Sequence, residues 1–466
     1  MLPMDVEILA RLQFALTIMF HYIYPPLSIG LGLVLVIIEG MYLKTRDPLY
    51  MQMAKFWTKV FALTFAMGVA TGIVMEFEFG TNWATYSRYV GDVFGSALAA
   101  EGVFAFMLES GFLAILLFGW DKVGPKLHFF STLMVCLGAH FSAIWIVVAN
   151  AWMQTPAGFH IVGEGLTARA EITEFWTMVF NPSSMVRLFH TVVGAWLAGA
   201  FLVISVSSFY LLKNKFKSFA RFSLKVGLIV AALSGILQLV LGHYSARIAA
   251  NYQPAKMAAF EGLYKTTKGA SLGLLGFADT KNERVIGIEV PKMLSFLLFD
   301  DLNAEVVGLD QFPKKDWPNV AVLYQTYHMM ILMWGLMFVT SFLALWYWWK
   351  GTLFEKKWML RWMVFSVVFP QIGNQVGWVS AEMGRYPWIV QGLLRISDGL
   401  SKSVTAEQVL GSIIMFGVVY FFLFMLFVYL LNEKIQHGPS EEDKASPYHQ
   451  LHAYVEELND GSHQQS

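Results

Sequence analysis

The segment Gly377-Trp-Val-Ser-Ala-Glu-Met-Gly-Arg-Tyr-Pro-Trp388 closes one of the long hydrophobic runs of this 466-residue chain. Tryptophans flank the segment, and a carboxylate, Glu382, lies just inside the end of the run. A charge at the edge of an apolar span is costly unless something pairs with it, and so it indicates a functional site. An ordinary surface ion pair with Arg385, three residues further along the helix, explains the segment equally well.

The composition around this segment indicates a membrane protein. Hydrophobic residues make up 56% of the chain and charged residues only 14%, and the mean hydropathy is +0.52. A soluble domain has about 25% charged residues, so most of the chain must lie in lipid. The net charge is zero, so no excess of positive charge indicates nucleic-acid binding. The single cysteine, Cys136, excludes an internal disulfide framework.

We predict an all-α membrane protein with nine transmembrane helices. Crossing a hydrocarbon core of about 30 Å takes about 20 apolar residues. Six spans lie in residues 1–242, a long loop covers 243–317, three spans lie in 318–431, and a polar, disordered tail covers 432–466. The predicted spans are 12–40, 52–76, 94–119, 127–150, 184–212, 220–242, 320–349, 359–380 and 408–431.

The basic residues predict how the spans are oriented. Lys and Arg gather in short connections on the cytoplasmic side of a membrane, and here they follow the first, third, fifth and seventh spans. The N-terminus is therefore predicted to be outside, the loop 243–317 outside, and the tail from Asn432 cytoplasmic. These residues are Lys44, Arg46, Lys55, Lys59, Lys122, Lys126, Lys213, Lys215, Lys217, Arg221, Lys350, Lys356, Lys357 and Arg361.

Four candidate iron ligands fall in the outer halves of their spans. His21, His190 and Met330 (beside His328) are predicted about 10–17 Å below the outer helix ends, with Glu382 at a similar level. A His–Met pair suits a six-coordinate electron-transfer haem, whereas a single His or carboxylate leaves a position open for a substrate such as oxygen. Each residue also has a structural explanation, since membrane histidines are often hydrogen-bonded in cores and methionines often fill packing gaps.

Two carboxylates, Glu101 and Glu109, interrupt the apolar third span. On a continuous helix they would lie about 12 Å apart in depth. A stepped pair of buried carboxylates is typical of a proton relay. A pair held neutral by its helix neighbours, or one that faces a partner subunit, remains the alternative.

Short motifs follow one another along the chain in an order that resembles subunit I of the cytochrome bd-type quinol oxidases. The resemblance runs from about Arg11 to about Leu430 and includes a short form of the outer loop. The motifs are Arg11-Leu-Gln-Phe-Ala-Leu-Thr17 with His21, Gly68-Val-Ala-Thr-Gly72, Met75-Glu-Phe77 with Phe79-Gly-Thr-Asn-Trp83, Glu101-Gly102, Leu108-Glu-Ser110, Asn150 with Trp152-Met-Gln154, Asn181-Pro182 with His190-Thr191, Lys256 with Glu261, and Gly377-Trp378 with Ala381-Glu-Met-Gly-Arg385 and Pro387-Trp388.

The resemblance implies three haems. His190 and Met330 would be the axial ligands of a low-spin haem b. His21 and Glu382 would each ligate one of the two others, a high-spin haem b and a haem d, and which of them holds haem d stays open. The resemblance also implies that Trp378 lies near the haems and that Arg385 pairs with a haem propionate.

The resemblance also implies a reaction and partners. Lys256 and Glu261 match quinol-binding positions, and Glu101 and Glu109 match proton-pathway glutamates. Ubiquinol or menaquinol would be oxidised at the outer face, and oxygen would be reduced to water with cytoplasmic protons, without pumping. A second membrane subunit, possibly with a small single-helix subunit, and a bacterial or archaeal cytoplasmic membrane are implied.

Three positions depart from the family pattern. His328 stands where an arginine is common, Gln375 replaces a frequent glutamate, and His140 replaces a small polar residue. From the residues alone, two other classes stay open. A secondary transporter would use buried carboxylates and broken helices, although no internal repeat is evident. A membrane haem b subunit of a quinone-linked dehydrogenase would show paired histidines and fewer spans.

Overall fold

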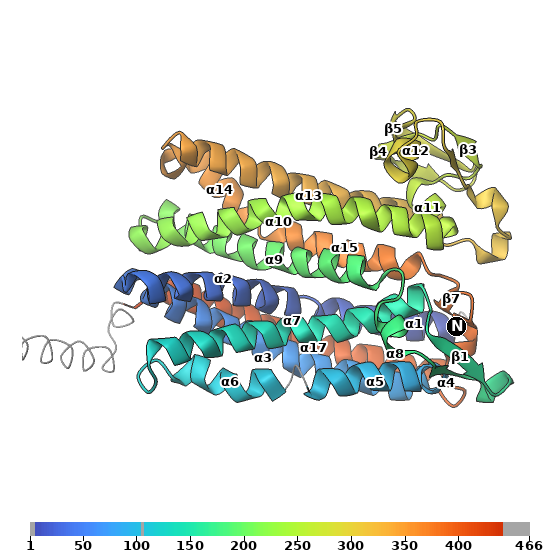
Figure 1. Ribbon diagram of the computed structural model, residues 1–466, viewed down its shortest axis with the longest axis horizontal. Coiled ribbons are helices and arrows are strands. Elements are labelled where there is room, and N and C mark those ends of the chain that lie inside the picture. The colour runs from blue at the N-terminus through green and yellow to red at the C-terminus, as the bar shows by residue number, and fades with distance from the viewer. Residues whose placement is uncertain (1–4, 104–106, 441–466) are drawn as a thin grey trace, which may run out of the picture.

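The computed structural model describes residues 5–103 and 107–440. Its long helices run side by side in one bundle (Figure 1). The helices are α1 (Val6–His21), α2 (Pro25–Thr45), α3 (Pro48–Thr81), α4 (Ala84–Tyr89), α5 (Gly91–Glu101), α6 (Met107–Phe118), α7 (Pro125–Gln154), α8 (Phe175–Val179), α9 (Ser184–Leu212), α10 (Lys217–Tyr252), α11 (Pro254–Glu261), α12 (Met293–Phe299), α13 (Val320–Trp349), α14 (Lys357–Phe365), α15 (Val368–Met383), α16 (Ile396–Gly399) and α17 (Ala406–His437).

The predicted class, a mostly helical membrane protein, is confirmed. Within the described residues, seven helical stretches are long and apolar enough to cross a membrane, with α1 and α2 counted together. The two remaining predicted spans correspond to shorter helices. α5 and α6 cover the predicted third span, with residues 104–106 between them outside the described residues, and α14 and α15 cover the predicted eighth span.

The break between α1 and α2 has a clear cause. α2 begins at Pro25, followed by Pro26. Proline has no backbone N–H and clashes with the preceding helical turn, so it starts a helix readily but interrupts one that is already running. α1 therefore ends at His21, which leaves this side chain at a helix terminus rather than in mid-span.

Close backbone contact joins α2 to α9 at the centre of the bundle. A Cβ atom added to Gly30 would lie 2.3 Å from the carbonyl oxygen of Ala195 and 2.7 Å from the backbone nitrogen of Gly199. Only glycine fits such a contact. Ala195 and Gly199 are spaced four residues apart, as small residues commonly are where membrane helices cross closely.

Four small antiparallel sheets lie at one end of the bundle, on the right in Figure 1, which we call the outer end. The predicted outer loop is largely structured, because α10 continues to Tyr252 and is followed by α11, strands and α12. The strand pairs are β1 (Phe159–Val162) with β2 (Arg169–Ile172), β3 (Thr267–Lys268) with β6 (Glu305–Val306), β4 (Leu272–Asp279) with β5 (Arg284–Val290), and β7 (Trp388–Val390) with β8 (Leu394–Arg395).

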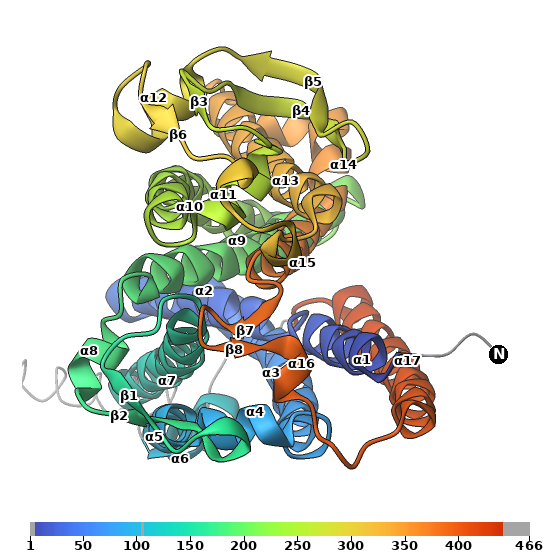
Figure 2. The same ribbon diagram turned by 90° about the vertical axis from the view of Figure 1, so that its right-hand side faces the viewer.

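Seen along the helices, α9, α10, α13 and α15 form one group (Figure 2). α9 packs on α10 and α15, and α13 packs on the same two helices. α17 continues to His437, beyond the predicted start of the tail. The part of the predicted disordered tail from residue 441 to residue 466 lies outside the described residues.

Candidate functional site

A buried polar cluster surrounds Glu382 at the outer end of α15. Asn150 Nδ2, from α7, donates a hydrogen bond to Glu382 Oε1 at 2.9 Å. Arg385 Nη2 donates to Glu382 Oε2 at 2.5 Å, and Arg187 Nη2, from α9, donates to Asn150 Oδ1 at 2.5 Å. Arg385 therefore contacts the Glu382 carboxylate directly through Nη2, and its predicted contact with a haem propionate stays a prediction.

Lys256 extends the cluster to α11. Its Nζ donates to Gln154 Oε1 and to the carbonyl oxygen of Ala381, both at 2.9 Å. Burial and the nearby Arg187 and Arg385 together hold the pKa of Lys256 well below its usual range. Lys256 thus fixes α11 to the ends of α7 and α15, and its side chain faces away from the loop strands.

The cluster has more cations than anions. Three basic side chains, those of Arg187, Arg385 and Lys256, surround the single carboxylate of Glu382. In the described part of the chain, Arg187 Nε and Arg385 Nη1 are buried and have no acceptor. Buried cations are costly unless they are paired, and guanidinium groups bind carboxylates most strongly. These free donors fit a ligand that carries carboxylate groups.

The hydrogen bonds of His21 leave one ring nitrogen available. Thr71 Oγ1 donates its only hydrogen to the carbonyl oxygen of Met67 at 2.8 Å, so it accepts from His21 Nδ1 at 2.9 Å. The Nε2 atom then carries a lone pair. Iron-ligating histidines commonly donate from the other ring nitrogen in this way, so His21 fits the predicted role of a single axial ligand.

His21 and Glu382 do not lie at the same depth, contrary to the prediction. α1 and α15 run antiparallel, and Gln375 Nε2 donates to the carbonyl oxygen of Met19 at 2.7 Å. His21 is two residues deeper than Met19, and Glu382 is seven residues further out than Gln375. At 1.5 Å per residue, Glu382 lies about 13 Å closer to the outer end. The prediction was wrong because it measured depth from helix ends that α1 and α15 do not share.

His190 and Met330 project from α9 and α13, which flank the same two helices. Met330 faces α15 at Gly377, where an added Cβ would lie 3.0 Å from the Met330 sulfur. His190 faces α10, where Gln238 Nε2 lies 3.1 Å from His190 Nε2 and 3.3 Å from Nδ1. Both residues therefore belong to the group α9, α10, α13 and α15, and their predicted role as a ligand pair stays a prediction.

Trp378, on α15, approaches the end of α1. Its ring meets that of Tyr22 edge-on, with ring centroids 5.5 Å apart. Because Trp378 lies one helical turn before Glu382 and Tyr22 directly follows His21, this contact links the two positions that the sequence predicted as ligands.

Glu261, at the end of α11, has partners that differ from those of Lys256. Its Oε2 accepts from the backbone N–H of Gly273 at 3.1 Å. Burial, with a contribution from the charge of Glu289, raises the pKa of Glu261 to about 8. Glu261 Oε1 and the hydroxyl of Tyr324 are buried without partners in the described residues. Lys256 and Glu261, the two residues predicted to bind quinol, therefore both lie on α11 but contact different groups.

His328, on α13, completes the surroundings of Glu261. An added Cβ on Gly273 would lie 2.9 Å from His328 Nε2 and 3.1 Å from the Tyr324 hydroxyl. His328 also stacks on Tyr324, with ring centroids 4.0 Å apart. Carboxyl, hydroxyl and imidazole groups thus meet closely around Gly273, where a larger residue would not fit.

Glu101 and Glu109 lie on separate helices, α5 and α6. Glu101 accepts a short hydrogen bond from the Ser142 hydroxyl on α7, and Glu109 is buried near the start of α6. The predicted 12 Å separation in depth assumes one continuous helix, and it stays a prediction. Residues 104–106, between the two helices, lie outside the described residues.

Sequence reasoning missed two buried groups. Arg187 was a detectable signal, because a charge three residues before His190 in an apolar span is costly without a partner. Glu39, on α2, was also overlooked, and it contacts His128 of α7 at the other end of the bundle. By contrast, His140 has a structural role, since its Nδ1 donates to the carbonyl oxygen of Cys136 and its Nε2 accepts from Trp196 Nε1.

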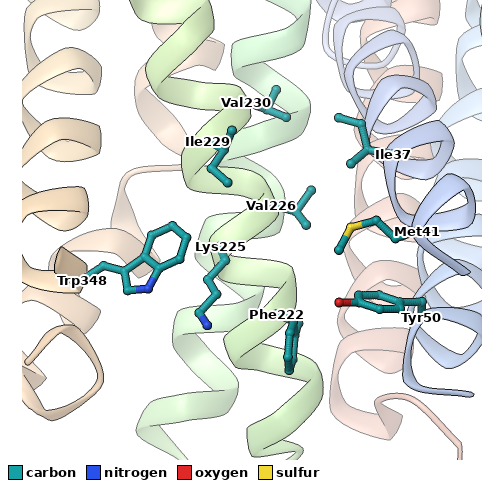
Figure 3. Close-up of a pocket in the computed structure, with 9 residues that line it drawn as sticks. All are labelled: Ile37, Met41, Tyr50, Phe222, Lys225, Val226, Ile229, Val230 and Trp348. Carbon is teal, nitrogen blue, oxygen red and sulfur yellow. The ribbon is translucent and has the colours of Figure 1, made fainter. Parts of the chain in front are cut away.

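An apolar cleft of about 240 Å³ lies between α2, α3, α10 and α13 (Figure 3). Lys225 Nζ lies there between the rings of Phe222 and Trp348, at 5.1 and 5.2 Å from their centroids. This cleft is about 20 Å along α10 from Gln238 and is separate from the outer cluster. Its lining is suited to lipid chains rather than to polar chemistry.

No group of three or more His, Cys, Asp or Glu side chains that could hold a metal ion occurs in residues 5–103 and 107–440.

Comparison with known proteins agrees with this geometry. Residues 9–439 match the family described as "Cytochrome bd terminal oxidase subunit I". The chain is 39% identical over 452 residues to "Cytochrome bd ubiquinol oxidase subunit 1" of Bacillus subtilis (strain 168), with 94% of this chain and 96% of that protein covered. It is 32% identical over 513 residues to "Cytochrome bd-II ubiquinol oxidase subunit 1" of Escherichia coli (strain K12), with 96% and 99% covered.

The fold is similar to that of a solved structure, the bd oxidase from Geobacillus thermodenitrificans. The TM-score is 0.86 at 27% sequence identity, with 94% of this chain and 100% of that chain covered. The chain therefore belongs to the cytochrome bd terminal oxidase subunit I family, which confirms its predicted enzyme class, a quinol:oxygen oxidoreductase of the membrane.

Proposed function

We propose that this chain is the haem-carrying subunit of a terminal oxidase that oxidises quinol at the outer face and reduces oxygen to water with cytoplasmic protons, without pumping. The observation that carries the proposal is the surplus of buried cations around Glu382. Arg187 Nε and Arg385 Nη1 have no acceptor in the described residues, and haem propionates are carboxylates that would provide one.

The residues fit two haem b groups and one haem d. His190 and Met330 would hold a low-spin haem b. His21, through Nε2, and Glu382 would each hold one of the high-spin haem b and the haem d, and both assignments of haem d remain compatible with the geometry. When bound, the haems carry electrons and supply the iron at which oxygen is reduced. Trp378 and Arg385 would border these haems.

Quinol would bind where α11 meets α13 and strand β4. Glu261 Oε1 and the Tyr324 hydroxyl are both buried and unpaired in the described residues, so they are available for the two hydroxyl groups of a quinol. With its pKa raised to about 8, Glu261 holds a proton at neutral pH and is suited to accept one from quinol once it is deprotonated, above neutral pH. Lys256 contributes by fixing α11. Ubiquinol and menaquinol share these hydroxyl groups, so both fit.

Glu101 and Glu109 would bring protons from the cytoplasm to the outer half of the bundle. The short hydrogen bond from Ser142 to Glu101 supports this path, because hydrogen-bonded hydroxyl groups pass protons to carboxylates. Each proton that crosses against the membrane potential stores about 2.3 kcal/mol per 100 mV. Energy would then be conserved without a pump.

A second membrane subunit, with or without a small single-helix subunit, would complete the enzyme in a bacterial or archaeal cytoplasmic membrane. The names of the relatives, subunit 1, support further subunits. α17 supports them as well, since only 11% of its most apolar window is buried within this chain. Lipid and partner helices would share this surface.

The absorption spectrum of the purified complex tests the proposed function. We expect three haems, including a chlorin band, and quinol-driven oxygen consumption. A spectrum with haem b alone would show that the haem d assignment is wrong, and a spectrum without haem would refute the whole proposal. Replacing His190 or Met330 by Ala should remove the low-spin haem signal, and an unchanged reduced spectrum would contradict that ligand pair.

A further inference from the structure

The hairpin β4–β5 exposes an unusually apolar face. Leu275 pairs directly with Ile288, and Phe277 pairs with Ile286. All four side chains point outward, and they are 53%, 62%, 55% and 41% exposed respectively. Exposed apolar patches of this kind on a structured hairpin usually mark a contact with a membrane or with another protein.

The hairpin lies beside a membrane-spanning helix and not above it. His328 Nε2 lies 3.2 Å from the carbonyl oxygen of Gly273, and Gln325 Nε2 donates to the carbonyl oxygen of Gly276 at 3.0 Å. His328 is eight residues from the start of α13, and so lies about 12 Å along the helix. Both views agree, because the hairpin flanks the outer end of α13 in Figure 1 and lies at the edge of the bundle in Figure 2.

The polarity of the hairpin changes along its length. The end that contains Gly273 lies deepest along α13, and the apolar pairs follow it. Glu289 pairs with Gly273 at this end, and because side chains alternate along a strand it points to the face opposite Ile288. The turn at the other end is charged, with Glu283 bonded to Lys314 Nζ at 2.8 Å and Asp279 facing Arg284 at 3.5 Å. Apolar strands with a charged tip directed away from the bundle are suited to a membrane–water boundary.

Neighbouring side chains identify the material that covers this face. Below the hairpin, α13 exposes Met329, Ile331 and Leu332, residues of a spanning helix. The apolar face of β4–β5 is therefore continuous with a lipid-facing surface. On the other side of the loop, α12 exposes Phe296 and Phe299, so the apolar band continues past α10.

We propose that the face formed by Leu275, Phe277, Ile286 and Ile288 is inserted in the outer leaflet, against lipid acyl chains. The hairpin would then anchor the outer loop in the membrane. Because the backbone of Gly273 holds Glu261 at 3.1 Å, the hairpin also forms the wall between this carboxyl group and the lipid.

Site-specific fluorescence in the complete oxidase complex tests this insertion. Ile288→Cys places one label on the proposed lipid face, and Lys281→Cys places a matched label at the exposed tip. Cys136 is the only cysteine of the chain and is buried, so the unsubstituted complex gives the background. The labelled complexes are reconstituted in nanodiscs and exposed in turn to nitroxide on lipid acyl chains and to aqueous iodide.

We expect acyl-chain nitroxide to quench the label at position 288 several-fold more than iodide does, and the reverse at position 281. Equal quenching of both labels by iodide would place the face in water and overturn the proposal. Protection of position 288 from both quenchers would also overturn it, because a protein would then cover the face. Phe277→Cys gives a second label on the same face if the first variant does not assemble.

Discussion

Two carboxylates at opposite ends of the bundle, the half-buried Glu382 and the buried Glu39, have contrasting surroundings. Glu39 is 2% exposed; its Oε1 accepts from His128 Nδ1 at 2.6 Å and its Oε2 from Thr132 Oγ1 at 2.5 Å. His128 Nε2 has no partner within the described residues, so the ring donates through Nδ1 alone. One carboxylate thus meets one imidazole and one hydroxyl group, and both of its oxygens are satisfied.

At Glu382 the balance between basic and acidic groups is different. Three basic side chains surround this carboxylate, and two of their nitrogen atoms remain without acceptors in the described residues. Both glutamates interrupt apolar helices, so a buried charge by itself does not distinguish a functional site from a structural contact. The excess of charge and the unsatisfied donors make this distinction, because a closed pair needs nothing further and an open cluster does.

The largest effect is expected from Glu382→Ala. We expect loss of one high-spin haem signal and a fall in quinol oxidase turnover of roughly 100-fold or more, since an axial ligand and its charge are removed together. Pyridine haemochrome analysis and oxygen consumption measure the two effects. Glu39→Ala is the matched control and should keep its full haem content. Equal haem loss in both variants would remove the contrast between the two sites.

Glu39→Ala should instead lower stability. Removal of the carboxylate leaves His128 and Thr132 without their buried acceptor, at a cost of about 3 kcal/mol. The midpoint of thermal unfolding of the detergent-solubilised complex checks this expectation. Glu39→Gln keeps an acceptor and should be affected less. A large loss of turnover at unchanged stability would show that Glu39 functions in catalysis.

Glu109→Gln tests a carboxylate that belongs to neither cluster. If Glu109 conducts protons, oxygen reduction should slow by about tenfold or more while the haem spectrum stays nearly intact. Spectra and turnover of the same preparation answer the question. Loss of a haem would instead identify Glu109 as a structural carboxylate, comparable to Glu39.

Glu261 should give the smallest effect, visible as a pH dependence. Its pKa is raised to about 8, so it is mostly protonated at neutral pH and gains its ability to accept a proton as the pH rises. Quinol-driven turnover should therefore increase by up to about tenfold between roughly pH 7 and pH 9. Glu261→Gln should lower turnover and abolish this rise.

An artificial electron donor that bypasses the quinol site is the control for Glu261. Turnover with this donor should not change in Glu261→Gln. Equal losses with quinol and with the artificial donor would place the defect beyond quinol oxidation and contradict the proposed role.

The sequence predicted the fold more completely than it predicted the contacts. Long apolar runs identified most of the spanning segments, because spanning a hydrocarbon core sets a minimum length. The break after His21 was missed, and with it the depth of His21 relative to Glu382. Depth measured from each helix end assumes that the helices are straight and that their ends lie at the same level. In this bundle the helices do not all end at the same level.

The sequence by itself determined the membrane class, the order of the motifs and the candidate ligands, because these properties depend on residue type and on position along the chain. The tertiary structure decided which groups meet. Asn150 reaches Glu382 across 232 residues, Arg385 binds Glu382, and a strand from the outer loop lies against α13. Charge balance and hydrogen-bond satisfaction arise between helices, and local sequence patterns do not record how helices pack.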